Sequence, residues 1–136
     1  MDNLRKIFQS QEELNEKIMP GIMNQISQSQ DLRVEWIKKY HLAAQQEMAE
    51  AMDSVDWKWW KYSEEKIDYQ NLKVELVDVL FFWVSMCLAA GFDAKEMTSA
   101  YFQKLKINHE RADKGYKTGE YQKVDKDGNE DNRSIK

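Results

Sequence analysis

The stretch that decides the fold is YQNLKVELVDVLFFWVSMCLAAG, residues 69–91. From Leu76 onward nearly every position is apolar, and a helix that is apolar on all sides is expected to be buried on all sides. Gly91 then supplies a residue that readily adopts the left-handed conformation with which many helices end. We therefore predict a central, fully buried helix from about Tyr69 to Ala90.

Three further helices are predicted, each beginning at a residue whose side chain can cap a helix. The chain of 136 residues has only 5 glycines and 1 proline, so residues that interrupt helices are scarce. The sequence thus predicts an all-α protein with a four-helix core. Besides the central helix, we expect one from Asp2 or Asn3 to about Met19, one from Asp31 to near Trp57, and one from Asp93, with Glu96 in a capping box, towards Gly115.

Two parts of the chain differ in composition. Residues 1–114 carry the helical patterns, whereas residues 115–136 are polar and poor in large apolar side chains. A segment of that composition cannot bury enough surface to fold independently. We expect an all-α domain followed by a polar C-terminal tail, of which residues 115–123 become ordered when a charged ligand binds.

Charge and cysteine content exclude several classes of function. The formal net charge is −4, so no general basic field would hold nucleic acid. Cys87 is the only cysteine, which fits a reducing compartment. The N-terminus lacks the pattern of a signal peptide, and the longest uncharged stretch, Val79 to Phe92, is too short to span a bilayer. These features predict a cytoplasmic protein without nucleic-acid or membrane partners.

Two acidic pairs are the strongest indication of chemistry. Glu75 and Asp78 lie three residues apart on the apolar central helix, and Glu47 and Glu50 repeat the spacing on the helix before it. Such pairs usually lie on a solvated face, but no charged residue follows Asp78 until Asp93. Buried carboxylates need a positive partner, and converging carboxylate oxygens suit Mg²⁺. We therefore predict a metal site formed by the four acidic residues.

A di-iron site is the other metal centre that helical carboxylates could form. Such sites require Glu-x-x-His pairs, yet Lys38 and Lys106 stand three residues before His41 and His109. Both histidines are therefore interpreted as surface or packing residues.

Basic residues line the last predicted helix. Lys104, Asn108 and Arg111 share one stripe, which suits phosphate oxygens, and a glycine-flanked segment with Tyr116 and Lys123 follows. The alternative, scattered surface cations before a disordered tail, is equally compatible with the periodicity. In the run WKWWK, residues 57–61, Trp57 and Trp60 share one face, whereas Trp59 is expected to point elsewhere and could meet a flat ring.

Together these segments resemble the dimeric dUTPases of the all-α NTP pyrophosphatase superfamily, to which MazG-like enzymes also belong. The segment from Glu47 through the tryptophan-lysine run to Lys61 is similar to the family's first acidic motif. Glu75 to Asp78 is similar to the second acidic motif. Gln11 to Asn15 resembles the uracil-binding motif, and residues 104–123 resemble the phosphate-binding region.

The resemblance implies a homodimeric, Mg²⁺-dependent hydrolase that converts dUTP to dUMP and pyrophosphate, with dUDP as an open question. It implies that Glu47, Glu50, Glu75 and Asp78 bind two or more Mg²⁺ ions and form the catalytic centre. The tail would close over the phosphates. The implied substrate-binding residues are Gln11, Asn15, Trp59, Lys61, Phe82, Lys104, Asn108, Arg111, Tyr116 and Lys123. Two alternatives stay open: a relative that hydrolyses dCTP or another nucleotide, and a non-catalytic helical interaction module.

Overall fold

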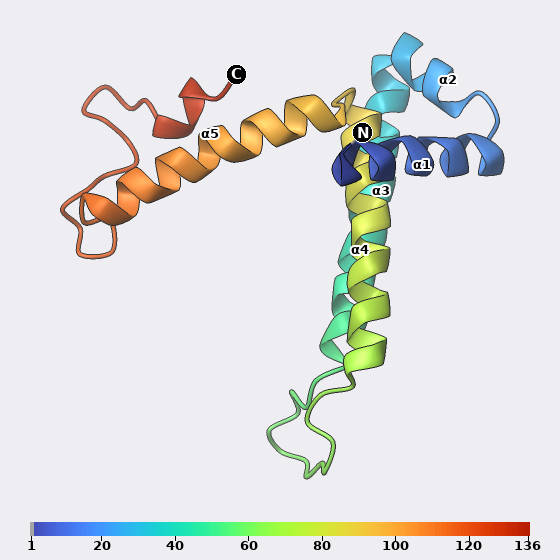
Figure 1. Cartoon of the computed structure of the whole chain (residues 1–136), viewed down its shortest axis with the longest axis horizontal. Helices are drawn as coiled ribbons and strands as arrows, with labels where there is room; N and C mark the ends of the chain where they lie inside the picture. The colour runs from blue at the N-terminus through green and yellow to red at the C-terminus, as the bar shows by residue number, and fades with distance from the viewer. Residues whose placement is uncertain (1) are drawn as a thin grey trace. The chain divides into compact units, whose positions relative to one another are not determined.

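The computed structural model describes residues 2–136, and its α-helices confirm the predicted all-α class. Within these residues the chain forms five α-helices and one short 3-10 helix (Figure 1). The elements are α1 (Asn3–Ile18), α2 (Ile22–Gln28), α3 (Gln30–Met52), α4 (Tyr69–Ala90), α5 (Ala94–Asp113) and η1 (Asp131–Ser134).

The chain divides into two compact units, Met1–Asp93 and Ala94–Lys136. The division groups α5 with the polar C-terminal residues, whereas the composition change in the sequence lies twenty-one residues later, after Lys114. The catalytic role expected for residues 1–114 and the closing role expected for residues 115–136 stay predictions.

Helices α3 and α4 form an antiparallel pair that is the frame of the first unit (Figure 1). Near one end of the pair, Arg33 Nη1 donates to the carbonyl oxygen of Ala89 at 3.0 Å. This bond satisfies one of the carbonyl groups that the end of α4 leaves without a helical partner. Gly91 closes α4 with φ of +88°, and a Cβ there would lie only 2.6 Å from Arg33 Nη1. The predicted left-handed glycine is therefore confirmed.

Helix α2 was not predicted, and tertiary packing explains it. Ile22 and Ile26, one helical turn apart, are each 2% exposed and pack with Ala89 of α4. The carboxylate of Glu16 accepts the backbone N–H groups of Gly21 and Met23 at 2.8 and 2.9 Å, which caps the first turn. The start of α3 also differs from the prediction, because Ser29 rather than Asp31 is its N-cap.

The expectation that α4 is buried on all sides is wrong for a single chain. Its C-terminal half is buried at Val84, Ser85 and Ala89, but several large apolar side chains in the middle are 37–47% exposed. They are exposed because α1 covers only part of α4 beyond its contact with α3. The exposed residues are Leu76, Val77, Leu80, Phe81 and Trp83.

The second unit consists of α5 and the C-terminal segment, which turns back along the helix (Figure 1). Gly115, with φ of +84°, lies just beyond the end of α5, as predicted. The segment is mostly turns, as its composition indicates, but Asp131–Ser134 forms a short 3-10 helix against α5.

Among residues 2–136, no single helix has both the length and the apolar character needed to cross a membrane. On length and composition alone, α4 and α5 taken together meet that test as a bent pair.

Candidate active site

A cluster of three carboxylates lies between α3 and α4. Glu47 on α3 and Glu75 and Asp78 on α4 each bring one oxygen to within 4.8 Å of the other two. All three side chains are partly buried. Antiparallel packing of α3 and α4 produces the cluster, because it places the second acidic pair of the sequence, Glu75 and Asp78, beside Glu47 of the first pair. Two helices therefore bring three carboxyl groups together at one point.

The electrostatics of the cluster fit a divalent cation. Glu75 Oε2 is buried and has no hydrogen-bond partner among the described residues. A hydrogen bond with Glu75, followed by burial and the neighbouring carboxylates, raises the pKa of Glu47 to about 7. Without a cation, the cluster thus retains a proton to reduce its own repulsion. Hard carboxylate oxygens in this arrangement suit Mg²⁺, which would give the orphaned oxygen a partner.

The fourth predicted ligand, Glu50, is not one of the three converging residues. It nevertheless lies close to the cluster, because its side chain hydrogen-bonds to Glu47. One of its oxygens also accepts a long hydrogen bond of 3.4 Å from Gln46 Nε2. The structure thus brings together three of the four predicted carboxylates and places Glu50 at the edge of the group.

A pocket of about 410 Å³ lies beside the carboxylates, and we call it the amide pocket. Two amide side chains of α1 face into the first unit: Gln11 is 6% and Asn15 is 8% exposed. Gln11 Nε2 donates to Asn15 Oδ1 at 3.0 Å. The pocket is lined by Gln11, Leu14, Asn15, Ile18, Met19, Trp36, Tyr40, Glu47, Asp78, Phe81, Phe82 and Ser85.

Two predicted substrate-binding residues lie elsewhere. Trp59 is 90% exposed in the loop that joins α3 to α4, where its ring meets Trp60 edge to face at 5.5 Å. Lys61 lines a separate pocket of about 520 Å³ within the same loop. A contact of either residue with a molecule in the amide pocket would require a movement of this loop or a second copy of the chain.

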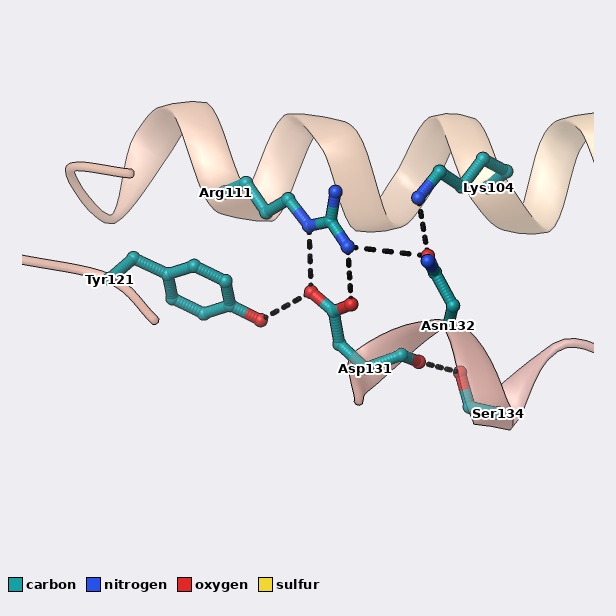
Figure 2. Close-up of polar contacts among 6 residues, drawn as sticks. All are labelled: Lys104, Arg111, Tyr121, Asp131, Asn132 and Ser134. Atoms are coloured by element: carbon teal, nitrogen blue, oxygen red, sulfur yellow. Dashed lines mark hydrogen bonds and ion pairs between the residues drawn. The ribbon is translucent and has the colours of Figure 1, made fainter. Parts of the chain in front are cut away.

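The predicted cationic stripe of α5 is held by the C-terminal segment (Figure 2). Arg111 donates from Nε to Asp131 Oδ2 at 2.8 Å, and Lys104 donates to the side-chain oxygen of Asn132. The ring of Tyr116 lies under the Arg111 guanidinium, 5.5 Å from its centre. The side chains of Asn108 and Lys123 are exposed. Four of these five predicted residues therefore lie on or next to α5, and two already bind oxygen atoms.

Sequence reasoning missed several residues of these sites. Trp36 and Tyr40 line the amide pocket from α3, and their rings lie 5.4 Å apart. The available signal was the spacing: Tyr40 follows Trp36 by four residues, and Glu47 follows Tyr40 by seven. On a helix these intervals place all three side chains on one face. Ser85 likewise follows Asp78 by two helical turns. Asp131 gave no such signal, because it lies in a segment without periodicity.

The chain is similar in sequence to known proteins. A family model described as dUTPase matches residues 3–90 of the chain. The dCTP pyrophosphatase of Enterobacteria phage T4 is 36% identical over 74 residues, which cover 46% of this chain and 43% of that protein. The chain thus spans less than half the length of this curated relative. No solved structure matches the chain significantly.

Proposed function

Because the chain belongs to the dUTPase family, we propose that it hydrolyses dUTP to dUMP and pyrophosphate in a reaction that requires Mg²⁺. One observation carries the proposal: Glu47 and Asp78 belong both to the carboxylate cluster and to the wall of the amide pocket. A nucleotide whose base enters the amide pocket can therefore extend its phosphates to the carboxylates.

In this proposal Glu47, Glu50, Glu75 and Asp78 hold two or more Mg²⁺ ions. When bound, Mg²⁺ neutralises phosphate charge and lowers the pKa of the attacking water. The carboxylates supply the hard oxygen ligands, and their partial burial limits competition from solvent for the same cation. Glu75 is the central ligand, since one of its oxygens is buried without another partner.

Glu47 is the carboxylate to which we assign the proton of the attacking water. It lies where the cluster and the pocket meet, and it hydrogen-bonds to Glu75. A general base must lie within reach of the proton that it accepts, and Glu47 is one of the two cluster residues that also line the amide pocket. Water attack requires no covalent enzyme intermediate.

The second unit contributes the phosphate-binding groups in this proposal. Lys104, Arg111 and Lys123 stabilise charge on the phosphate oxygens, and Asn108 and Tyr116 orient them. Arg111 supports this role, because in the structure it binds both oxygens of the Asp131 carboxylate, and a phosphate offers the same fork of oxygens. Substrate oxygens would then replace Asp131.

Uracil is the base that we assign to the amide pocket, with Gln11 and Asn15 at its polar edge and Phe82 against the ring. The alternative is cytosine, and the 36% identity with a dCTP pyrophosphatase favours it as the second candidate. The two bases have the same size and differ in the order of their donors and acceptors. A pocket lined by amides can therefore be built for either one.

A second copy of the chain is the partner that we propose for the exposed face of α4. Val77, Leu80 and Phe81 line an apolar groove of about 440 Å³ together with Ile7 and Leu14 of α1. An apolar surface of this kind costs free energy in water and is commonly covered by a symmetric partner. A homodimer would complete the burial that the sequence pattern of α4 predicts.

An assay over the common nucleoside triphosphates and dUDP tests the function. We expect Mg²⁺-dependent release of pyrophosphate, with dUTP as the best substrate and dUMP formed in equal amount. A preference for dCTP would support the proposed reaction but assign cytosine, instead of uracil, to the amide pocket. Absence of turnover with every nucleotide, together with absence of Mg²⁺ binding in calorimetry, would favour the non-catalytic module.

A further inference from the structure

Ser85 is the deepest polar residue of the amide pocket. It lies on α4 among the buried Val84, Cys87 and Leu88, and it is only 1% exposed. A hydroxyl in such surroundings must hydrogen-bond within the protein, because burial without a partner is costly. Ser85 satisfies that requirement in two directions, one along its own helix and one towards α1.

The hydrogen bonds of Ser85 continue into a relay with a fixed direction. Its hydroxyl donates to the carbonyl oxygen of Phe81 at 2.8 Å. Ser85 Oγ in turn accepts from Asn15 Nδ2 at 3.1 Å. Asn15 Oδ1 then accepts from Gln11 Nε2 at 3.0 Å. Each bond thus points the same way, from α1 towards the backbone of α4.

The backbone carbonyl of Phe81 determines this direction. A carbonyl can only accept, so the Ser85 hydroxyl that donates to it has only lone pairs left for Asn15. The reverse relay, in which Ser85 donates to Asn15 and Asn15 to Gln11, would lose the bond to Phe81. Three hydrogen bonds form in the observed direction and only two in the reverse one. The observed orientation of both amides is therefore favoured.

The direction decides which groups remain for a ligand. In the observed relay Gln11 keeps its Oε1 acceptor and one N–H, and Asn15 keeps one N–H. If both amides turned over, the positions of oxygen and NH₂ would be exchanged. Uracil presents acceptor, donor and acceptor along its pairing edge, whereas cytosine presents donor, acceptor and acceptor. The orientation of the amides is thus the difference that separates these bases.

We propose that Ser85 is a positioning residue that fixes the orientation of the Asn15 and Gln11 amides and thereby sets the selectivity between uracil and cytosine nucleotides. The inference rests on the proposed function, because it assumes that the base enters the amide pocket. Ser85 itself need not touch the substrate.

Ser85→Ala tests the inference, since it removes the hydroxyl and nothing else. Without the anchor each amide can turn to suit either base, so the ratio of kcat/KM for dUTP and dCTP should fall about tenfold towards one. The change should come from KM of the disfavoured nucleotide, with kcat for the preferred one nearly unchanged. Ser85→Thr keeps the hydroxyl and should restore the ratio.

Val84→Ala is the matched control. Val84 is 0% exposed beside Ser85, so its truncation lowers stability but leaves the relay intact. It should leave the ratio between the two nucleotides unchanged. A ratio in Ser85→Ala within twofold of wild type would overturn the inference.

Nuclear magnetic resonance of the side-chain amides separates this inference from the proposed function. The Asn15 NH₂ signals, assigned with Asn15→Ala, should shift and exchange faster with solvent in Ser85→Ala than in Val84→Ala. If wild type hydrolyses neither nucleotide, the proposed function fails, and these signals alone decide the relay. Asn15 signals that are identical in Ser85→Ala and wild type would overturn it.

Discussion

Arg111 and Asp131, twenty residues apart, form a two-pronged ion pair, with Nε to Oδ2 at 2.8 Å and Nη2 to Oδ1 at 2.5 Å. Tyr121 adds a hydrogen bond from its hydroxyl to Asp131 Oδ2 at 3.0 Å (Figure 2). The Asp131 carboxylate therefore binds the Arg111 guanidinium, which is the cation that we assign to phosphate. This pairing holds the C-terminal segment against α5. An oxyanion that binds Arg111 would therefore have to displace Asp131.

Acidification should release the segment. The Arg111 guanidinium, followed by the Tyr121 hydroxyl, holds the pKa of Asp131 well below its ordinary 3.8. A depressed folded pKa means that the contribution is fully present above about pH 4 and is lost as the pH falls through the folded value. The protection of residues 124–136 against hydrogen exchange, taken relative to the intrinsic rate at each pH, should therefore be constant down to about pH 4 and fall below it.

Asp131→Asn should loosen the same segment at neutral pH and tighten the binding of inorganic pyrophosphate, because Arg111 loses its competing carboxylate. Asp127→Asn, in the exposed turn nearby, is the control and should change neither property. An Asp131 carboxyl that titrates at its ordinary pKa would contradict the pairing in solution.

Glu75→Gln should abolish Mg²⁺-dependent hydrolysis while preserving the helical circular dichroism spectrum. The substitution removes a metal ligand at nearly constant volume and also relieves repulsion in the cluster. The melting temperature of the metal-free protein should therefore be unchanged or higher. Glu13→Gln, on the exposed side of α1, controls for the loss of one charge. Activity of Glu75→Gln within a few-fold of wild type would remove the metal cluster from the mechanism.

Val77→Glu should convert the proposed dimer to a monomer, as measured by light scattering at low micromolar concentration. Val77 is 44% exposed in the groove between α1 and α4, so a single chain accommodates the charge, whereas an apolar interface does not. Gln70→Glu adds the same charge at the start of α4 and should leave the mass unchanged. A monomeric wild-type protein would refute the dimer itself.

The main helices could be predicted because their signals are local. Asp2 caps α1, Gly91 ends α4, and the apolar run of α4 predicts a helix, although it overstates the burial of that helix in a single chain. Helix α2 could not be predicted, because its 7 residues are too few to establish a periodic pattern. Its stability comes from Ala89 and Glu16, which are distant in sequence or outside the helix. Tertiary packing overrides local preference in such short elements.

The carboxylate cluster was predictable for an energetic reason and Gln11, Asn15 and Phe82 from a family resemblance, whereas other residues of the site were not predictable. Acidic residues within an apolar helix need a cation, so Glu75 and Asp78 pointed to a metal without any knowledge of packing. The roles of Trp36, Tyr40 and Ser85 depend on how α3 and α4 are aligned. The Arg111 and Asp131 pair depends on the path of a polar segment, and that path cannot be predicted from helical periodicity.

Asn15→Ala should raise KM for dUTP about tenfold and reduce the preference over dCTP, because a buried group left unpaired costs about 1–3 kcal/mol. The change removes the middle of the relay, so both Gln11 and Ser85 lose a partner. Uracil's two carbonyls and its N–H need two donors and an acceptor, whereas the single remaining amide presents only its oxygen and one adjacent N–H along one edge and so pairs with two of the three groups. Mg²⁺ affinity should not change, since Asn15 is outside the carboxylate cluster.

Asn24→Ala, at an exposed amide on α2, should leave both substrate constants as they are. If Asn15→Ala behaves like Asn24→Ala in this assay, the base binds somewhere other than the amide pocket.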